Sequence, residues 1–309
     1  LITHKLHEVM DISQRVTVLR KGEMVATVDT ADSTKSSLAE LLVGRAFDFA
    51  VNKEKVERGK PILEIEGLSV LRDNGTRGLK DFSITVHAGE IVGLAGVSGN
   101  GQPELFDACV GVREAESGKI VLDSGTVTGL SPLEISNKGL ASIPQDRLKQ
   151  GLISDFSVQE NLILGIHGNK PYCANSVINW NQVKQFSEDA IQNFNIATMG
   201  PEQKVKQLSG GNLQKVILAR EVSHGVKALV ASSPTRGLDI DATYYVYQRF
   251  LQLLKDGAGI LLISEDLDEI FNISDRIAVI FNGQLMGKFE ADQVSREQVG
   301  LLMAGVREE

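Results

Sequence analysis

The stretch LSGGNLQKVILAR, residues 208–220, together with KALVASSPTRGLD, residues 227–239, decides the fold. Ser209, Gly210 and Gly211 stand directly before apolar residues at helical spacing, so a hydroxyl and free backbone amides are expected at a helix N-terminus. Such an end attracts anions. An ordinary serine cap would explain the hydroxyl but not the two glycines. The apolar run KALVA predicts a buried strand.

Strand-like and helix-like segments alternate on both sides of this stretch. The runs EIVGLA, residues 90–95, and GILLI, residues 259–263, are short and apolar, as in buried parallel strands. Ser157 and Glu160 form the pattern of a capping box at a helix start, and apolar residues recur at helical spacing from 183 to 194. The alternation predicts an α/β fold with a largely parallel core sheet. An antiparallel β lobe is expected around residues 62–87.

A glycine-rich loop, GVSGNGQP at residues 96–103, follows one of the expected strands. Gly96 and Gly101 keep the spacing of the phosphate-binding motif G-x-x-x-x-G-K-[ST], whose backbone amides surround phosphate oxygens. However, Gln102 replaces the lysine, and Pro103 replaces the hydroxyl that holds Mg²⁺ and has no N–H to offer. These residues by themselves predict a tight turn as readily as a nucleotide site.

An internal repeat pairs residues 2–25 with residues 263–286 at a constant offset, from Ile2 to Ile263. Two similar strand–helix–strand units would explain it, but a fixed offset favours tandem copies of a module of about 260 residues. We therefore expect residues 1–46 to be the C-terminal tail of a first module. Residues 47–61, charged and ending in Gly-Lys-Pro, form an expected exposed linker, and residues 62–309 form a whole second module.

Composition excludes several classes of protein. The 309 residues carry 32 Lys+Arg against 40 Asp+Glu, a net charge of -8, which disfavours broad nucleic-acid binding. The apolar runs are too short to span a membrane. Cys109 and Cys173 cannot form a disulfide framework, which fits a reducing compartment, and no His/Cys cluster has the spacing of a metal site.

These motifs resemble the ATP-binding subunit of an ABC importer, of the type that fuses two ATPase modules in one polypeptide. LSGGN, residues 208–212, matches the family's signature, PTRGLD, residues 234–239, matches the loop after the catalytic strand, and IPQDR, residues 143–147, matches the loop that senses the membrane partner. Residues 62–305 are similar to second modules of simple-sugar and nucleoside importers, and residues 1–46 to first modules. The segments GNGQ, PTRG and ISEDL favour a resemblance to the nucleoside branch of these importers.

The resemblance implies a P-loop NTPase-like ABC module with a parallel core sheet, an antiparallel β lobe and a helical signature subdomain at roughly residues 150–225. It implies ATP as cofactor, membrane permease subunits as partners, an extracytoplasmic solute-binding protein as an indirect partner, and a peripheral location on the cytoplasmic face of the membrane. The residues that it assigns to nucleotide contact are Gly96, Gly99, Asn100, Gly101, Gln102, Gln145, Ser209, Gly210, Gly211 and Asp239.

Several working side chains of the family are replaced. Active modules carry an Asp for Mg²⁺ and a Glu as general base where this chain has Ser232 and Ser233, and serine supplies neither function near pH 7. The switch histidine becomes Glu265, for which an acid in a helix first turn is the simpler reading. In the first copy, His4 keeps the histidine; its setting favours the switch role over a surface histidine.

The expected function is therefore asymmetric. Two modules of this family pair head-to-tail, so this module would donate its LSGGN segment to the partner module's ATP and Mg²⁺, while its own loop binds ATP weakly or not at all. The full-length subunit would be an ATPase that energises uptake of a nucleoside or simple sugar, and this chain alone would be inactive. The alternative is a non-catalytic module that docks on the permease and regulates it. A third reading, an ABC protein of translation or DNA repair, is disfavoured by the acidic charge.

Overall fold

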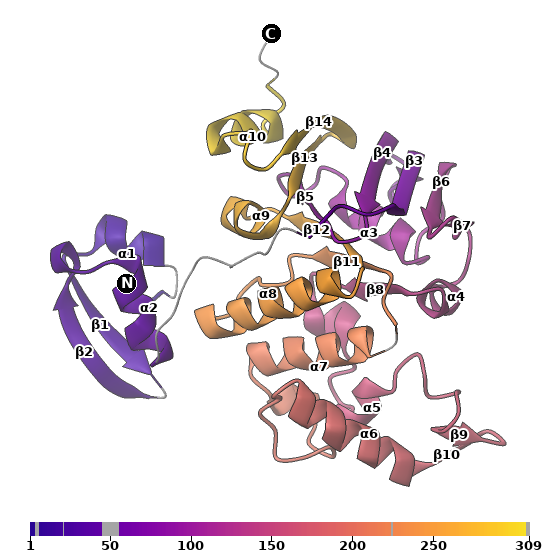
Figure 1. Cartoon of the computed structure of the whole chain (residues 1–309), viewed down its shortest axis with the longest axis horizontal. Helices are drawn as coiled ribbons and strands as arrows, with labels where there is room; N and C mark the ends of the chain where they lie inside the picture. Colours follow the sequence, from indigo (N-terminus) through magenta and orange to yellow (C-terminus); the bar gives the residue numbers. More distant parts are fainter. Residues whose placement is uncertain (4–5, 21, 45–55, 224, 307–309) are drawn as a thin grey trace.

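The computed structural model describes residues 1–3, 6–20, 22–44, 56–223 and 225–306. A small N-terminal unit lies beside a larger body that contains the central sheet (Figure 1). In the described part of the chain, no helix is long and apolar enough to cross a membrane. The predicted switch residue His4 and residues 47–55 of the predicted linker lie outside the described residues.

The central sheet has six strands in the order β14-β13-β5-β12-β11-β8. Neighbouring strands run parallel except at one edge, where β14 is antiparallel to β13. The three predicted apolar strands are confirmed, and every residue of them is buried, as expected when both faces of a parallel sheet are covered. The bounds are β5 Ile91–Ala95, β8 Leu140–Ile143, β11 Ala228–Ser232, β12 Gly259–Ser264, β13 Arg276–Phe281 and β14 Gln284–Glu290.

Each central strand contributes to two hydrophobic cores, because successive side chains point to opposite faces of a sheet. In β12, for example, Ile260 and Leu262 belong to the core beneath the helices, whereas Leu261 and Ile263 belong to the core that faces the β lobe. The fully buried Phe250 of helix α8 (Ile240–Lys255) fills the first core. The sheet is thereby packed between two apolar layers, which fix the positions of its strand ends.

The predicted antiparallel β lobe is confirmed, and it extends beyond the predicted residues. Strands β3 (Pro61–Leu71) and β4 (Arg77–His87) pair antiparallel, and Phe82, Ile84 and Val86 are buried while their neighbours are not. The sheet has the order β4-β3-β6-β7, so the later strands β6 (Ser117–Leu122) and β7 (Gly125–Thr126) complete it.

Helices cover the sheet and form a separate group between β8 and β11 (Figure 1). The predicted capping box is confirmed at the start of α5, where Ser157 and Glu160 bond each other's backbone amides. The predicted amphipathic helix is α6, which ends one residue before Phe194. The remaining bounds are α3 Gln102–Cys109, α4 Pro132–Asn137, η2 Arg147–Gly151, α5 Val158–Leu162, β9 Cys173–Ala174, β10 Val177–Ile178, α6 Trp180–Asn193, η3 Val205–Gln207, α7 Gly210–Val222, α9 Leu267–Ile273 and α10 Arg296–Met303.

The N-terminal unit has its own small core and a two-stranded sheet. Val18 and Leu38 are buried in this core, against which Ile240 and Tyr244 of α8 also pack. The unit therefore contacts the larger body through the first turns of α8. Its elements are α1 Leu6–Ile12, β1 Arg15–Arg20, β2 Glu23–Asp29, η1 Thr30–Asp32 and α2 Lys35–Val43.

Candidate functional site

Three loops that carry predicted site residues leave the central sheet at one edge. They follow β5, β12 and β11, which are adjacent and parallel, with Ala95 beside Ser264 and Ile263 beside Ser232 in the register. Because parallel strands end at the same edge of a sheet, the structure brings the glycine loop, Glu265 and the Ser232–Ser233 pair to one place. The sequence predicted the glycine loop after a strand, the resemblance supplied Ser232, Ser233 and Glu265, and the strand order explains why these residues lie close together.

The glycine loop, residues 96–101, runs directly into α3. Gly101 has a φ of 109°, and a Cβ there would lie 2.5 Å from the carbonyl oxygen of Gly78. A side chain is therefore excluded at this position by both conformation and space. The helix begins with Gly101 as the N-cap and Pro103 in the first turn, where the missing N–H costs the helix little.

Gln102 lies across this loop and joins its two arms. Its side chain is only 6% exposed; Oε1 accepts from the Asn100 N–H at 3.1 Å, and Nε2 donates to the Val97 carbonyl at 3.0 Å. A Cβ at Gly96 would lie 2.7 Å from Nε2, so the amide rests against the start of the loop. The side-chain Nδ2 of Asn100 also donates to the carbonyl oxygen of Val97. A neutral side chain thus holds together the loop in which a lysine would reach for phosphate.

Ser232 and Ser233 end β11 next to β12. Ser232 is buried, and Ser233 has a positive φ of 43°, with its N–H donating to Ile263 O at 2.7 Å. The chain then turns through residues 234–238 to Asp239, whose carboxylate caps α8 by accepting from the Ala242 N–H at 2.8 Å. The two serines offer hydroxyls where a carboxylate pair would be needed to bind Mg²⁺ and to accept a proton.

Glu265 is exposed and stands before the cap of α9, not in its first turn as the simpler sequence interpretation had it. Asp266 is the N-cap and accepts from the Asp268 N–H. The interpretation was wrong by two residues because the chain needs an extended residue at the cap before it can enter the helix.

Glu269 is a buried carboxylate whose contacts the sequence did not reveal. One oxygen accepts from Ser264 Oγ at 2.5 Å, and the other accepts from Thr235 Oγ1 at 2.5 Å and from the Thr235 N–H at 3.2 Å. Burial raises the pKa of Glu269, and the Ser264 and Thr235 bonds partly oppose this rise. Glu269 thereby connects the loop after β11 to the loop after β12. The internal repeat was a usable signal, since Thr3 and Glu8 form the same bond, at 2.7 Å, at the matching positions of the first copy.

The LSGGN segment, residues 208–212, forms a second group of predicted residues. Ser209 is the N-cap of α7, but its hydroxyl makes no bond to the backbone amides of the first turn. It accepts instead from the side-chain Nδ2 of Asn212 at 2.9 Å. Gly211 packs against α8, where a Cβ would lie 3.0 Å from that of Ala242. Ser209 is exposed, and Gly210 and Gly211 are half-buried at this helix N-terminus, a position suited to binding an anion.

Gln145 is half-buried in the short segment that connects β8 to η2, and it is distant in sequence from the glycine loop. All ten assignments to nucleotide contact stay predictions: Gly96, Gly99, Asn100, Gly101, Gln102, Gln145, Ser209, Gly210, Gly211 and Asp239. Among the described residues, no group of three His, Cys, Asp or Glu side chains is placed to hold a metal ion.

Comparison with known proteins identifies close relatives of the whole chain. The family model for ABC transporters matches residues 79–236. The nucleoside import ATP-binding protein NupA of Lactococcus lactis subsp. cremoris (strain MG1363) is 38% identical over 305 residues, covering 99% of this chain and 60% of that protein. The guanosine import ATP-binding protein NupO of Bacillus subtilis (strain 168) is 41% identical over 294 residues, covering 95% and 58%. The chain thus spans about three fifths of the length of these relatives.

Solved structures confirm the predicted fold class. The crystal structure of a nucleotide-free ATP-binding cassette from an ABC transporter matches with a TM-score of 0.64 at 23% sequence identity, over 75% of this chain and 92% of that chain. This likeness concerns the α/β architecture, with its mostly parallel sheet and antiparallel lobe.

Proposed function

This chain belongs to the ABC transporter family of ATP-binding domains, and we propose that it is part of the ATP-binding subunit of an importer for nucleosides or simple sugars. The names of two relatives refer to the import of nucleosides and of guanosine, which supports the nucleoside branch. Membrane permease subunits are then its partners, a solute-binding protein acts upstream of them, and the subunit is peripheral at the cytoplasmic face of the membrane.

Within that subunit, we propose that this module does not hydrolyse ATP at its own glycine loop. The residues do not fit ATP with Mg²⁺. The Gln102 side chain spans the loop and accepts the backbone N–H of Asn100, which is then not offered to phosphate, and Ser232 and Ser233 bring no carboxylate. Phosphoryl transfer depends on positioned charge, and each charge that the family places here is missing.

The observation that carries the proposal is the contrast between this loop and the LSGGN segment. At the start of α7, Ser209 is exposed and its hydroxyl makes no bond to the backbone amides of the first turn, which have no acceptor within the helix. We propose that the module pairs head-to-tail with a first ATPase module and presents this helix end to the ATP and Mg²⁺ bound there.

Residues 1–44 support the proposal that a first module contributes its tail to this chain. α1, β1 and β2 begin and end at positions that match α9, β13 and β14 at the offset of the repeat. Both strand pairs share one register and one irregularity, which falls after Val18 in the first copy and after Val279 in the second. Two copies of one sequence pattern thus adopt the same structure down to a β-bulge.

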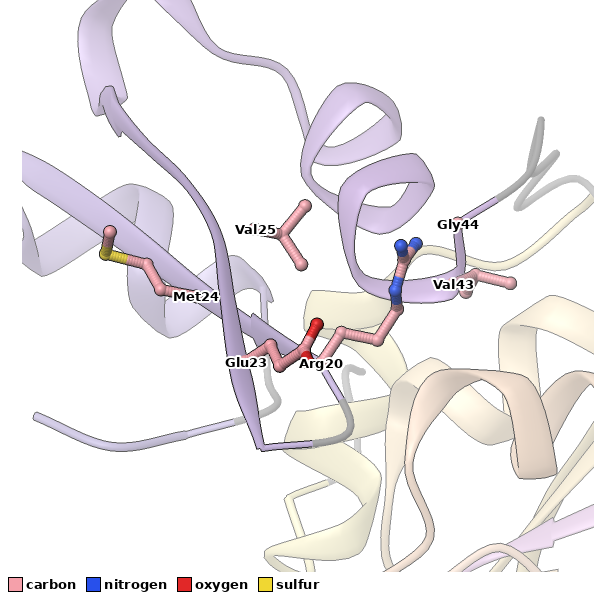
Figure 2. Close-up of a pocket in the computed structure, with 6 residues that line it drawn as sticks. All are labelled: Arg20, Glu23, Met24, Val25, Val43 and Gly44. Carbon is pink, nitrogen blue, oxygen red and sulfur yellow. The ribbon is translucent and has the colours of Figure 1, made fainter.

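The exposure of matching residues differs between the copies. Leu19 is 62% exposed, whereas its counterpart Ile280 is fully buried in the core that faces the β lobe. Met24 is 69% exposed, whereas its counterpart Leu285 packs against that same core. Figure 2 shows the neighbouring hollow, where Arg20 reaches the end of α2 beside Gly44. We propose that the remainder of the first module covers Leu19 and Met24.

Cysteine labelling tests this tail. In a Cys173→Ser background, we expect Leu19→Cys to react with a maleimide in this chain but to be protected in the full-length subunit, because a covering strand would exclude the reagent. Glu23→Cys is the matched control: Glu23 and its counterpart Gln284 are both exposed, so labelling should be equal in the two forms. Equal labelling of Leu19→Cys would contradict the tail assignment.

ATP turnover tests the loss of the second site. We expect this chain to release phosphate from ATP with Mg²⁺ no faster than background, and Gln102→Lys not to change this, because Pro103, Ser232 and Ser233 remain. The measurement is steady-state phosphate release. Turnover that Gln102→Ala abolishes would show a working site. Micromolar ATP affinity by calorimetry would show that the loop opens despite Gln102.

A further inference from the structure

Strand β1 has one open edge, whereas its counterpart in the repeat, β13, is paired on both sides. Among the described residues, β1 pairs with β2 alone, in a two-stranded sheet separate from the central sheet (Figure 1). β13 pairs with β14 on one side and runs parallel to β5 on the other. β5 leads directly into the glycine loop. Because an open edge is a template for a further strand, the repeat indicates which kind of strand belongs beside β1.

Arg15 of β1 and Arg276 of β13 are identical residues at matching positions, but their surroundings differ. Arg276 is half-buried, and its Nε and Nη2 bind the buried carboxylate of Glu90 at 2.6 and 2.9 Å. Arg15 is exposed, and its side chain has no hydrogen bond or ion pair to any described residue. Since Glu90 directly precedes β5, the repeat places a carboxylate at the start of the strand that belongs beside β1.

The turns that follow the two strands show the same contrast. Gly22 and Gly283 have φ values of 84° and 78°. The Gly283 N–H donates to the Asn100 carbonyl oxygen in the glycine loop at 3.0 Å, and the Lys80 N–H of the β lobe donates to the Gly283 carbonyl oxygen at 2.9 Å. A Cβ on Gly283 would collide with Gly78 of the β lobe, whereas one on Gly22 would meet nothing within 4 Å. These contacts use backbone atoms, so they do not depend on the side chains that this module has replaced.

We propose that the strand leading into the first module's phosphate loop adds to the open edge of β1, with Arg15 bound to a carboxylate at the start of that strand and the Gly22 turn against the loop at its end. The inference rests on the proposed function, in which the first module binds ATP with Mg²⁺. About two fifths of each named relative lies outside the part that matches this chain, which leaves room for such a segment.

Arg15 is then a positioning residue of the ATP site. It does not touch ATP, but it fixes the strand from which the phosphate loop begins. Two bonds from one guanidinium to one carboxylate set orientation as well as distance, and phosphoryl transfer depends on how precisely the phosphates are held. The tail at residues 1–44 thereby supports the catalytic loop of a module whose remainder lies outside this chain.

Hydrogen exchange tests whether the edge of β1 is occupied. We expect deuterium uptake in a peptide covering residues 15–20 to be lower in the full-length subunit than in this chain, because an added strand protects the amides. A peptide covering residues 276–281 is the control, since that strand is paired on both sides in this chain. Equal uptake at 15–20 in the two forms overturns the proposal. Protection that appears only at high concentration of the full-length subunit places a second copy at the edge and overturns it too.

Thermal unfolding tests the pairing of Arg15. We expect Arg15→Ala to leave the Tm of this chain unchanged but to lower that of the full-length subunit by several degrees. Arg276→Ala breaks a pair that this chain already contains, so it should lower the Tm of both forms. Glu23→Ala is the matched control, because Glu23 and its counterpart Gln284 are both exposed, and it should change neither. An unchanged Tm of the full-length Arg15→Ala variant contradicts the pairing.

ATP kinetics of the full-length subunit test the positioning role. We expect Arg15→Ala to raise the KM for ATP about tenfold, the effect of one lost charged contact. A merely structural loss would reduce the amount of active protein, and so the apparent kcat, at unchanged KM. Arg15→Lys, which also serves if the alanine variant does not fold, should fall between, because an ammonium keeps the charge but not the fork. An unchanged KM overturns the positioning role. If the wild type does not hydrolyse ATP, the proposed function fails, while exchange and unfolding still decide whether β1 and Arg15 are engaged.

Discussion

In the full-length subunit, Gly210→Asp is expected to abolish ATP hydrolysis coupled to uptake. A carboxylate at the first turn of α7 would face the phosphates of the partner's ATP, where the helix end now offers amides. Ser209→Ala removes one donor, and loss of a preorganised donor costs about 2.7–4 kcal/mol, or roughly a hundredfold in rate or more. ATPase rates of the reconstituted transporter give both values.

Gly210→Asn is the matched control for charge. A Cβ at Gly210 has no neighbour closer than 3.7 Å, so an uncharged side chain fits and should leave much of the rate. The expected order of rates is wild type equal to Gln102→Lys, then Ser209→Ala, then Gly210→Asp. Rates untouched by Ser209→Ala and Gly210→Asp would mean that the LSGGN segment is a relic, and would favour the regulatory module.

Glu90→Ala is expected to lower the free energy of unfolding by about 3–5 kcal/mol, the usual loss when one partner of a buried ion pair is removed. The Glu90 carboxylate is 1% exposed and is bound by both Nε and Nη2 of Arg276, at 2.6 and 2.9 Å, and by the His87 N–H. It joins the start of β5 to β13 and the β lobe. Urea denaturation measures the change. Glu116→Ala, which breaks an exposed pair with Arg77, should cause almost none.

The same pair predicts a pH dependence. Burial acts to raise the pKa of Glu90, but the bonds from Arg276 and His87 outweigh it, so the pKa lies below the ordinary value of 4.5. The carboxylate therefore contributes its full stability above pH 4.5 and loses it as the pH falls through the lower folded pKa. The stability difference between wild type and Glu90→Ala should shrink over that range. A constant difference would contradict the role of the ionised pair.

Local patterns were sufficient to predict the elements that carry the candidate site. Unbroken apolar runs identified β5, β11 and β12, and the glycines at 96–101 identified the loop after the first of them, because burial on both faces and tight turns leave direct traces in composition. The addition of β6 and β7 to the β lobe was not predicted, since strand pairing across distant segments leaves no local periodicity.

The sequence by itself determined the chemical inventory: an LSGGN segment, a glycine loop with Gln102 for lysine, serines for carboxylates, and a repeat that relates residues 2–25 to 263–286. Only the tertiary structure decided what these groups touch. Gln102 closes its own loop, Glu269 connects Thr235 to Ser264, and Arg147 reaches Gln214 and Arg236. The reason is physical: residue type and spacing specify the donors and acceptors of each segment, whereas a hydrogen bond forms only between segments that the packing of the sheet and helices brings within about 3 Å.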